Sequence, residues 1–407
     1  MAAAAGQPCD FQTAPCPQGE FCERNDPGCD LGENCAGTCH PLPTYQFCGG
    51  LAHVQCKDYG QKCYDDPRDE CSLDHGDADC GGICLDHHHH PTHLRLQSAQ
   101  IKPPPPKRTV LITGCSDGSL GSALALAFHA STSGWRVFAS ARNPAKLTAC
   151  TTAGIETLCL DTTSPASIAS AVSHISALVG DSGLDALLNN AGAGYSMPLI
   201  DLDINKAKAL YDVNVWSLIG VTRAFLPLLR KSSHPYGPLV ANNTSQSSQI
   251  PGTVPFTAAY TSSKAAATSL TEAMRLELGV LGIKVVNLMT GTVDSGFRGN
   301  LERLEIPGDS PYVKVKEEVE KAMAMEGMDD GAMDAGVWAA EVVRELGREK
   351  PSHWVWKGTF SGLVRLANHL PVGLLDGKMK EVSGLDAVEK RVRELGGPRG
   401  LLADDRK

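Results

Sequence analysis

"RTVLITGCSDGSLGSALALAF", residues Arg108–Phe128, is the stretch of sequence that decides the fold. Its β-branched start predicts a buried parallel strand, and its end predicts a helix. Between the two, Gly114, Gly118 and Gly121 remove the side chains that would keep a ligand away from the backbone N–H groups. A strand, a glycine loop and a helix in this order form a cradle for a pyrophosphate, although a glycine loop alone also matches ordinary turns.

Three further strands follow, with helical stretches between them. They are WRVFASARN (Trp135–Asn143), TLCLD (Thr157–Asp161) and LDALLNNAG (Leu184–Gly192). This alternation predicts an α/β fold, a Rossmann-type doubly wound parallel sheet that binds ligands at the carboxyl ends of its strands. Arg142 lies just past the second strand, where a basic side chain favours the 2′-phosphate of NADP and an acidic one favours NAD. A plain surface charge is the alternative interpretation of Arg142.

A tyrosine and a lysine lie four residues apart in AAYTSSKAAATSLTEAMRLEL, a stretch that predicts a helix. Tyr260 and Lys264 therefore share one helix face. A free tyrosine has a pKa near 10, and an ammonium one turn away favours the phenolate and lowers that pKa towards neutrality. In isolation such a pair is often a chance combination, so its meaning depends on the pattern upstream.

The chain resembles the short-chain dehydrogenase/reductase superfamily, of the kind with an extended glycine loop, over about residues 108–300. TG-x3-G, NNAG, NVW, a serine and Y-x3-K carry this resemblance, because they occur in that order and spacing. VLITGCSDGSLGSALA, VFASARN and YDVNVW are most similar to fungal NADPH-dependent 1-acyldihydroxyacetone-phosphate reductase-like proteins. The resemblance implies an enzyme that transfers hydride between NADP(H) and a ketone or secondary alcohol.

The resemblance also implies roles for single residues. Tyr260 is expected to protonate the carbonyl oxygen, while Lys264 lowers the pKa of that tyrosine and holds the nicotinamide ribose. Asn214 is expected to order a relay water, and Ser245 to bind the substrate oxygen. The implied cofactor contacts are Gly114, Ser116, Leu120 and Gly121 at the phosphates, Arg142 at the 2′-phosphate, Asp161 at the adenine, Asn190 at the adenosine ribose and Val293 at the carboxamide, with Ser295 in the usual threonine position.

Three features depart from the family pattern. The glycine loop has one residue more than the usual TG-x3-G-x-G. Ser247 has the usual thirteen-residue spacing to Tyr260, whereas Ser245 fits the strand end NNTS. We expect Ser245, because a loop absorbs a two-residue insertion more readily than a buried strand does. Finally, Thr290-Gly291 replaces the proline-glycine pair of many relatives.

The first 84 residues hold twelve cysteines in two sets of six, each of which ends in C-x3-C. The shared spacing indicates two copies of one small module within residues 1–86. CYDDPRDECSLDHGDADCGGIC resembles cysteine-rich segments of fungal secreted proteins. Modules this short bury little apolar surface, so we expect disulfides worth about 2–4 kcal/mol each, with fifteen pairings open per module. Metal binding is the competing interpretation, but zinc sites favour C-x2-C pairs, and we expect no metal.

Residues 87–107 form a His/Pro-rich linker that contains a stiff polyproline run, Pro103–Pro106. Beyond it we expect a Rossmann-fold core at 108–300 and a substrate-capping, helical region at 301–407. No signal peptide is visible, because the chain starts without a basic segment and a leucine-rich core. The cysteines favour an oxidising compartment, whereas we expect the reductase in the cytoplasm or at the surface of the endoplasmic reticulum or of lipid droplets.

The composition limits the kinds of binding partner that we expect. Residues 1–107 hold 15 acidic and 7 basic side chains, so −8 of the net charge of −9 lies there and no basic field for nucleic acid exists. No stretch reaches the roughly 18 apolar residues that span a bilayer. The amphipathic stretch Trp356–Met379 is expected either to pack in the core or a homo-oligomer or to contact a membrane surface, which would suit a lipid-like carbonyl substrate.

Three hypotheses follow. An NADPH-dependent carbonyl reductase is favoured by the intact set of Asn214, Ser245, Tyr260 and Lys264. A secreted cysteine-rich binding protein with a non-catalytic Rossmann scaffold predicts a signal peptide and a damaged site instead. A joined gene model of two proteins would explain the abrupt change at the prolines. An acyl dihydroxyacetone phosphate, a steroid-like ketone and a secondary-metabolite ketone are all compatible substrates.

Overall fold

The computed structural model divides the chain into two compact units, Met1–Lys102 and Pro103–Lys407. The structure describes six strands of the first unit and residues 107–132, 134–251, 253–297, 302–325 and 331–402 of the second. The division falls within the expected linker, residues 87–107.

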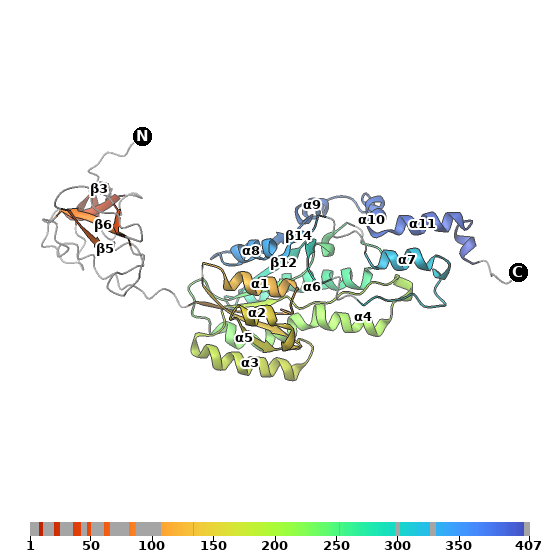
Figure 1. Cartoon of the computed structure of the whole chain (residues 1–407), viewed down its shortest axis with the longest axis horizontal. Coiled ribbons are helices and arrows are strands. Elements are labelled where there is room, and N and C mark those ends of the chain that lie inside the picture. Colours follow the sequence, from red (N-terminus) through yellow and green to blue (C-terminus); the bar gives the residue numbers. More distant parts are fainter. Residues whose placement is uncertain are drawn as a thin grey trace. The chain divides into compact units, whose positions relative to one another are not determined.

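The first unit contains two small antiparallel sheets with matching strand orders, β1-β3-β2 and β4-β6-β5 (Figure 1). In each sheet the strand that comes last in the sequence, β3 or β6, lies in the middle and pairs with the other two. The register places Cys22 opposite Cys39 and Cys63 opposite Cys84. The expected disulfides lie outside the described residues. The strands are β1 (Pro8–Asp10), β2 (Glu20–Arg24), β3 (Ala36–Pro41), β4 (Phe47–Gly49), β5 (Gln61–Asp65) and β6 (Gly81–Asp86).

The second unit is built on a seven-stranded sheet of order β15-β12-β11-β10-β7-β8-β9, in which all neighbours are parallel. The chain reverses its direction of progress between β7 and β10, and such a switch point is where open α/β sheets bind ligands. The predicted Rossmann-type fold is confirmed. The strands are β7 (Arg108–Thr113), β8 (Trp135–Ala141), β9 (Glu156–Cys159), β10 (Ala186–Asn189), β11 (Leu239–Asn243), β12 (Lys284–Thr290) and β15 (Trp354–Lys357).

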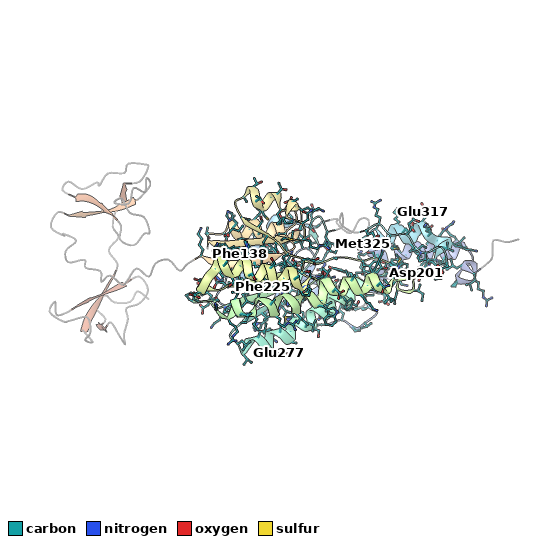
Figure 2. The ribbon with its side chains drawn as sticks, turned by 90° about the horizontal axis from the view of Figure 1, so that it is seen from below. Phe138, Asp201, Phe225, Glu277, Glu317 and Met325 are labelled. Atoms are coloured by element: carbon teal, nitrogen blue, oxygen red, sulfur yellow. The ribbon has the colours of Figure 1, made fainter. Side chains whose placement is uncertain are left out.

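Helices cover both faces of this sheet (Figure 1). In β7, Val110 and Ile112 pack into the core on one face and Leu111 into the core on the other, as the two-residue period of a strand requires. Figure 2 shows Phe138 and Phe225, which share the second core. The first face carries α1 (Leu120–His129), α2 (Thr148–Thr152) and α8 (Ala335–Leu346), and the second carries α3 (Pro165–Val179), α5 (Ser217–Arg230) and α6 (Ala258–Gly279).

A helical lobe lies at the end of the unit where α7, α10 and α11 are drawn in blue (Figure 1). Figure 2 labels Asp201 and Glu317 in this lobe. Its own apolar cluster includes Tyr195, Phe256 and Val388. The lobe contains α4 (Ile204–Tyr211), α7 (Lys316–Met323), α10 (Asp376–Ser383) and α11 (Leu385–Glu394).

Part of the segment 301–407 belongs to the sheet and not to a cap. β15 is the edge strand beside β12, and α8 packs against α1. The apolar residues of HWVWK and VWAAEVVREL complete the sheet and its first core, because an uncovered β12 would expose a strand edge. None of the described helices is long and apolar enough to cross a membrane.

Candidate active site

The glycine loop between β7 and α1 is built around two close backbone approaches. Gly114 has φ +75°, and a Cβ atom there would lie 2.8 Å from the Cα atom of Ala191. A Cβ atom on Gly121 would lie 2.3 Å from the carbonyl oxygen of Gly114 and 2.5 Å from Nδ2 of Asn190. Any larger residue would therefore push α1 away from the sheet. Ser119 caps α1, and the helix N-terminus and loop backbone form the type of cradle that holds a pyrophosphate.

Asp117, between Gly114 and Gly118, ties the glycine loop to α2. Its carboxylate accepts hydrogen bonds from the backbone N–H groups of Thr148 and Ala149, at the start of α2. These bonds hold the pKa of Asp117 below its usual value. The sequence analysis missed this contact, although a carboxylate inside a glycine loop is the signal. The loop, including the half-exposed Ser116, is thereby tied to the segment that follows β8.

Arg142 and Asp161 follow β8 and β9, the two strands beyond β7. Arg142 is exposed, and Asp161 is partly buried. Hydrogen bonds from Thr163 lower the pKa of Asp161, and the nearby charge of Arg142 lowers it further. The two side chains thus lie at the carboxyl edge of the sheet on the glycine-loop side, where an exposed guanidinium fits a phosphate group.

Tyr260 and Lys264 lie one turn apart in α6, as their spacing predicts. Nζ of Lys264 is 6.0 Å from the ring centroid of Tyr260 and donates a hydrogen bond of 2.9 Å to the main-chain oxygen of Asn243. The Ser245 side chain interacts with the Tyr260 phenol and lowers its pKa. The ring of Phe297 lies 5.6 Å from the Tyr260 ring, centroid to centroid. A proton donor, a hydroxyl and a cation therefore meet at the carboxyl edge of the sheet.

The two candidate serines have different positions. Ser245 follows β11 with one residue between and accepts hydrogen bonds from both the N–H and the hydroxyl of Ser247, the latter at 3.0 Å. Of these two serines, Ser245 is the one that lowers the pKa of the Tyr260 phenol. Ser247 lies in a short 3-10 helix, Gln246–Gln249. The insertion relative to the usual spacing therefore lies after the strand.

Asn214 lies in a π-helical turn, Asp212–Trp216, between α4 and α5. Such turns are rare and occur frequently at functional sites. Its Oδ1 accepts the N–H of Ala193 at 2.8 Å, and its Nδ2 donates to the oxygen of Ala193 and to the Ser263 hydroxyl at 3.0 Å. A Cβ atom on Gly192 would lie 3.4 Å from both Oδ1 of Asn214 and Nζ of Lys264, so the amide and the ammonium lie close together.

A chain of side chains crosses the strand ends, and the sequence analysis missed it. Oγ1 of Thr290 donates to Oδ1 of Asn243 at 2.6 Å, and Nδ2 of Asn243 donates to Oδ1 of Asn190 at 2.8 Å. Nδ2 of Asn190 donates to the oxygens of Thr113 and Gly114 at 2.9 and 3.3 Å. Both ends of the Asn190 amide are therefore hydrogen-bonded to other groups of the protein. The signal was the replacement of a proline by Thr290.

The segment after β12 runs back towards the glycine loop. Val293 belongs to β13 (Val293–Asp294), which pairs in parallel with β14 (Met333–Asp334). The N–H of Gly296 donates to the oxygen of Gly118 at 2.8 Å, just past the partly buried Ser295. This segment thus joins the end of the sheet to the loop and brings Phe297 to Tyr260.

Burial controls the protonation of the two central groups. It lowers the pKa of Lys264 to about 8. It also raises the pKa of Tyr260, an effect that the Ser245 side chain only partly opposes. We expected Lys264 to lower the tyrosine pKa, but desolvation of the phenolate is the larger effect. A neutral phenol is the form that donates a proton.

Among the described residues, no group of three or more His, Cys, Asp or Glu side chains is arranged to hold a metal ion. The arrangement instead combines a phosphate cradle at β7 with a tyrosine, serine and lysine set at β11 and α6. Such a site suits proton transfer to an oxygen beside a bound nucleotide.

Known proteins share both sequence and fold with this chain. The family model for short chain dehydrogenase matches residues 108–305. Two solved short-chain dehydrogenase structures have the same fold. One is from Streptomyces avermitilis (TM-score 0.54, 24% identity, 70% of this chain and 98% of the other). The second, from Burkholderia cenocepacia in complex with NADP, has a TM-score of 0.51 and 21% identity over 67% of this chain and 97% of the other.

Two fungal relatives extend this similarity in sequence. An NADPH-dependent 1-acyldihydroxyacetone phosphate reductase of Schizosaccharomyces pombe is 34% identical over 277 residues, which cover 65% of this chain and 90% of the relative. A short-chain dehydrogenase/reductase of Pestalotiopsis microspora is 43% identical over 290 residues, 70% of this chain and 98% of the relative. The chain described here therefore belongs to the short-chain dehydrogenase/reductase family.

Proposed function

We propose that this protein is an NADPH-dependent carbonyl reductase. The observation that carries the proposal is the contact between the Tyr260 phenol and Ser245, one helix turn from Lys264 and at the same sheet edge as the glycine loop. NADPH, when bound, supplies the hydride. The remaining work, which is binding the carbonyl and supplying a proton, falls to side chains that this edge already assembles.

Tyr260 gives its phenolic proton to the substrate oxygen, since burial keeps the phenol neutral at physiological pH. Ser245 holds that oxygen by a hydrogen bond and keeps it within reach of the phenol. Lys264 supplies positive charge beside the tyrosine and binds the nicotinamide ribose. Asn214 holds the π-helical turn against α6 and orders the water through which the proton is replaced.

NADPH is preferred over NADH in this proposal because Arg142 is the exposed cation at the end of β8, where the adenosine 2′-phosphate lies in such folds. The S. pombe relative, which is named as NADPH-dependent, supports the same choice. Asn190 offers its main chain to the ribose, because its side chain is already bonded. The remaining proposed contacts are Gly114, Ser116, Leu120 and Gly121 with the phosphates, Asp161 with the adenine, and Val293 and Ser295 with the nicotinamide.

We propose a carbonyl substrate with a large apolar part, of which 1-acyldihydroxyacetone phosphate is one candidate. The name of the S. pombe relative and the Phe297 ring beside Tyr260 support this choice. α9 (Ser361–Ala367) buries Val364 but exposes Leu363 and Leu366, so the expected single apolar face is divided. The exposed side chains suit contact with a membrane surface or with a second copy of the chain. The first contact would place the protein at the surface of a lipid layer.

Cofactor binding by the full chain tests the proposal. Nicotinamide fluorescence is titrated with NADPH and NADH for the wild type, Arg142→Asp and Tyr260→Phe, with Arg230→Asp as a remote control of equal charge change. We expect the wild type and Arg230→Asp to prefer NADPH, and Arg142→Asp to reduce that preference by about tenfold or more. Tyr260→Phe should still bind. A folded wild type that binds neither nucleotide would overturn the proposed function.

A further inference from the structure

The Lys264 ammonium is held by a main-chain oxygen whose own position depends on side chains. The acceptor is the oxygen of Asn243, at 2.9 Å, at the last residue of β11. The peptide group that carries this oxygen is bonded to β12 on one side only, where the N–H of Thr244 donates to the oxygen of Leu288 at 3.0 Å. Its orientation therefore depends on this one main-chain bond and on whatever else restrains Asn243.

The Asn243 side chain adds a further restraint from both sides. Oδ1 accepts from the Thr290 hydroxyl at 2.6 Å, at the end of β12, and Nδ2 donates to Asn190 at 2.8 Å, just past β10. A partly buried amide with both ends bonded to neighbouring strands has one orientation available. Loss of either bond leaves a polar atom without its partner and allows the residue to rotate.

The same chain reaches the phosphate cradle. Asn190 donates to the main-chain oxygens of Thr113 and Gly114, and Gly114 approaches the Cβ position of Gly121 at the start of α1. Four strand ends are thus connected by side-chain amides and a hydroxyl, from Thr290 to the loop. A change at one end alters the restraint at the other.

We propose that Thr290 and Asn243 are positioning residues, which fix the oxygen that holds Lys264 and couple this lysine to the phosphate-binding loop through Asn190. The inference rests on the proposed function for its consequence in catalysis, and on the hydrogen-bond geometry alone for the position of Lys264. Neither residue touches the substrate or the reacting atoms. Their effect is exerted on the charge beside Tyr260.

Thr290→Val tests this link, because valine keeps the shape of threonine and removes only the hydroxyl. Thr290→Ser keeps the hydroxyl and should behave as the wild type. Thr222→Val is the matched control, since the Thr222 hydroxyl also accepts a bond from a strand-end asparagine, Asn189, at 3.0 Å, but this asparagine leads through Asn242 to Thr271 and not to the oxygen that holds Lys264. Thermal unfolding of all three verifies that they are folded.

The first readout is the pH dependence of NADPH binding. Thr290→Val should weaken binding by about fivefold, because the loop and the lysine lose a shared restraint. An ammonium without a fixed acceptor loses its proton more readily, so the decline of binding with rising pH should move to a pH lower by about 0.7. Thr290→Ser and Thr222→Val should show neither change. Equal effects of Thr290→Val and Thr222→Val, or no effect of Thr290→Val, would overturn the proposal.

The second readout needs no nucleotide and therefore separates this proposal from the proposed function. The near-ultraviolet absorbance of tyrosinate is titrated, and the contribution of Tyr260 is obtained by subtracting a Tyr260→Phe titration. Thr290→Val should raise the pKa of Tyr260 further, since a displaced or neutral Lys264 stabilises the phenolate less. An unchanged Tyr260 titration refutes the positioning role, whether or not the wild type binds NADPH.

Discussion

The two edges of the central sheet each bury a cation, and they do so by different means. At the carboxyl edge Lys264 is nearly enclosed and has one main-chain acceptor, the oxygen of Asn243. At the amino edge Arg108, the first residue of β7, is 4% exposed and lies between two aromatic rings. Its guanidinium carbon is 4.1 Å from the ring centroid of Trp135 and 5.6 Å from that of Tyr236.

The difference separates a site for chemistry from a site for stability. A buried lysine loses its proton more readily, and the pKa of Lys264 falls to about 8, so its charge responds to its surroundings in the range where enzymes work. Arginine remains charged, and stacking on aromatic faces offsets part of its desolvation. The nearby Asp185 is fully engaged, with bonds from Thr109 at 2.8 and 3.1 Å and from Ser232 at 2.6 Å. Lys264 at the carboxyl edge is thus a cation whose charge can adjust, and Arg108 at the amino edge is a cation whose charge is fixed.

The largest expected effect is on the rate of reduction. Tyr260→Phe removes the only proposed proton donor, and we expect kcat for the best ketone from a substrate screen to fall by about a thousandfold. NADPH affinity should stay within about twofold, because the phenol faces the substrate. The matched variant at the amino edge, Tyr236→Phe, should retain wild-type kcat. Stopped-flow measurement of NADPH oxidation separates the two edges, and a Tyr260→Phe enzyme with more than a tenth of the wild-type rate contradicts the assignment.

The features of the fold and of the candidate site that could be predicted from the sequence are those with a fixed local pattern. The strand, glycine loop and helix at Arg108–Phe128 and the four-residue spacing of Tyr260 and Lys264 define local geometry, so they were predictable. The choice of Ser245 over Ser247 was also reasoned from the strand end and stays a prediction; of the two, Ser245 is the one that lowers the pKa of the Tyr260 phenol.

The parts that were missed depend on contacts between distant segments. Thr290 and Asn243 are 47 residues apart, and their bond exists only because β11 and β12 are neighbours in register. The expected direction of the Tyr260 pKa also needed tertiary information, since burial outweighs the helix-turn spacing to Lys264. β15 was not assigned to the sheet, because four residues after a long intervening segment carry little periodic signal.

The second largest effect is expected on the free energy of unfolding when Lys264, at the carboxyl edge, is replaced. The folded protein binds a proton at Lys264 with a pKa of about 8, against 10.5 for the ordinary side chain, which corresponds to about 3 kcal/mol of destabilisation at pH 7. Lys264→Met removes this cost and also a hydrogen bond worth about 1 kcal/mol. We therefore expect the free energy of unfolding to rise by about 2 kcal/mol at pH 7 while activity is lost.

The sign of the pH dependence identifies the cause. Between pH 8 and 10.5 the unfolded chain binds more protons at Lys264 than the folded one, so this group increases wild-type stability as pH rises. The advantage of Lys264→Met should therefore shrink through that range. Urea unfolding at pH 7 and pH 9.5 measures it, with Lys321→Met at an exposed position as the control. A gain that stays constant with pH would assign the effect to packing and not to charge.

The smallest effect is expected at Arg108, and it completes the contrast. Arg108→Lys keeps the charge but replaces a flat guanidinium by an ammonium that stacks poorly and needs more solvation, so we expect a loss of about 1 kcal/mol in unfolding free energy. NADPH affinity and the pH dependence of binding should not change, because the glycine loop and Lys264 lie at the opposite end of the strands. Urea unfolding and nicotinamide fluorescence on the same preparation measure both. A shift in NADPH affinity above about threefold would show that the two edges are energetically coupled through β7, and the division between an adjustable edge and a fixed one would then fail.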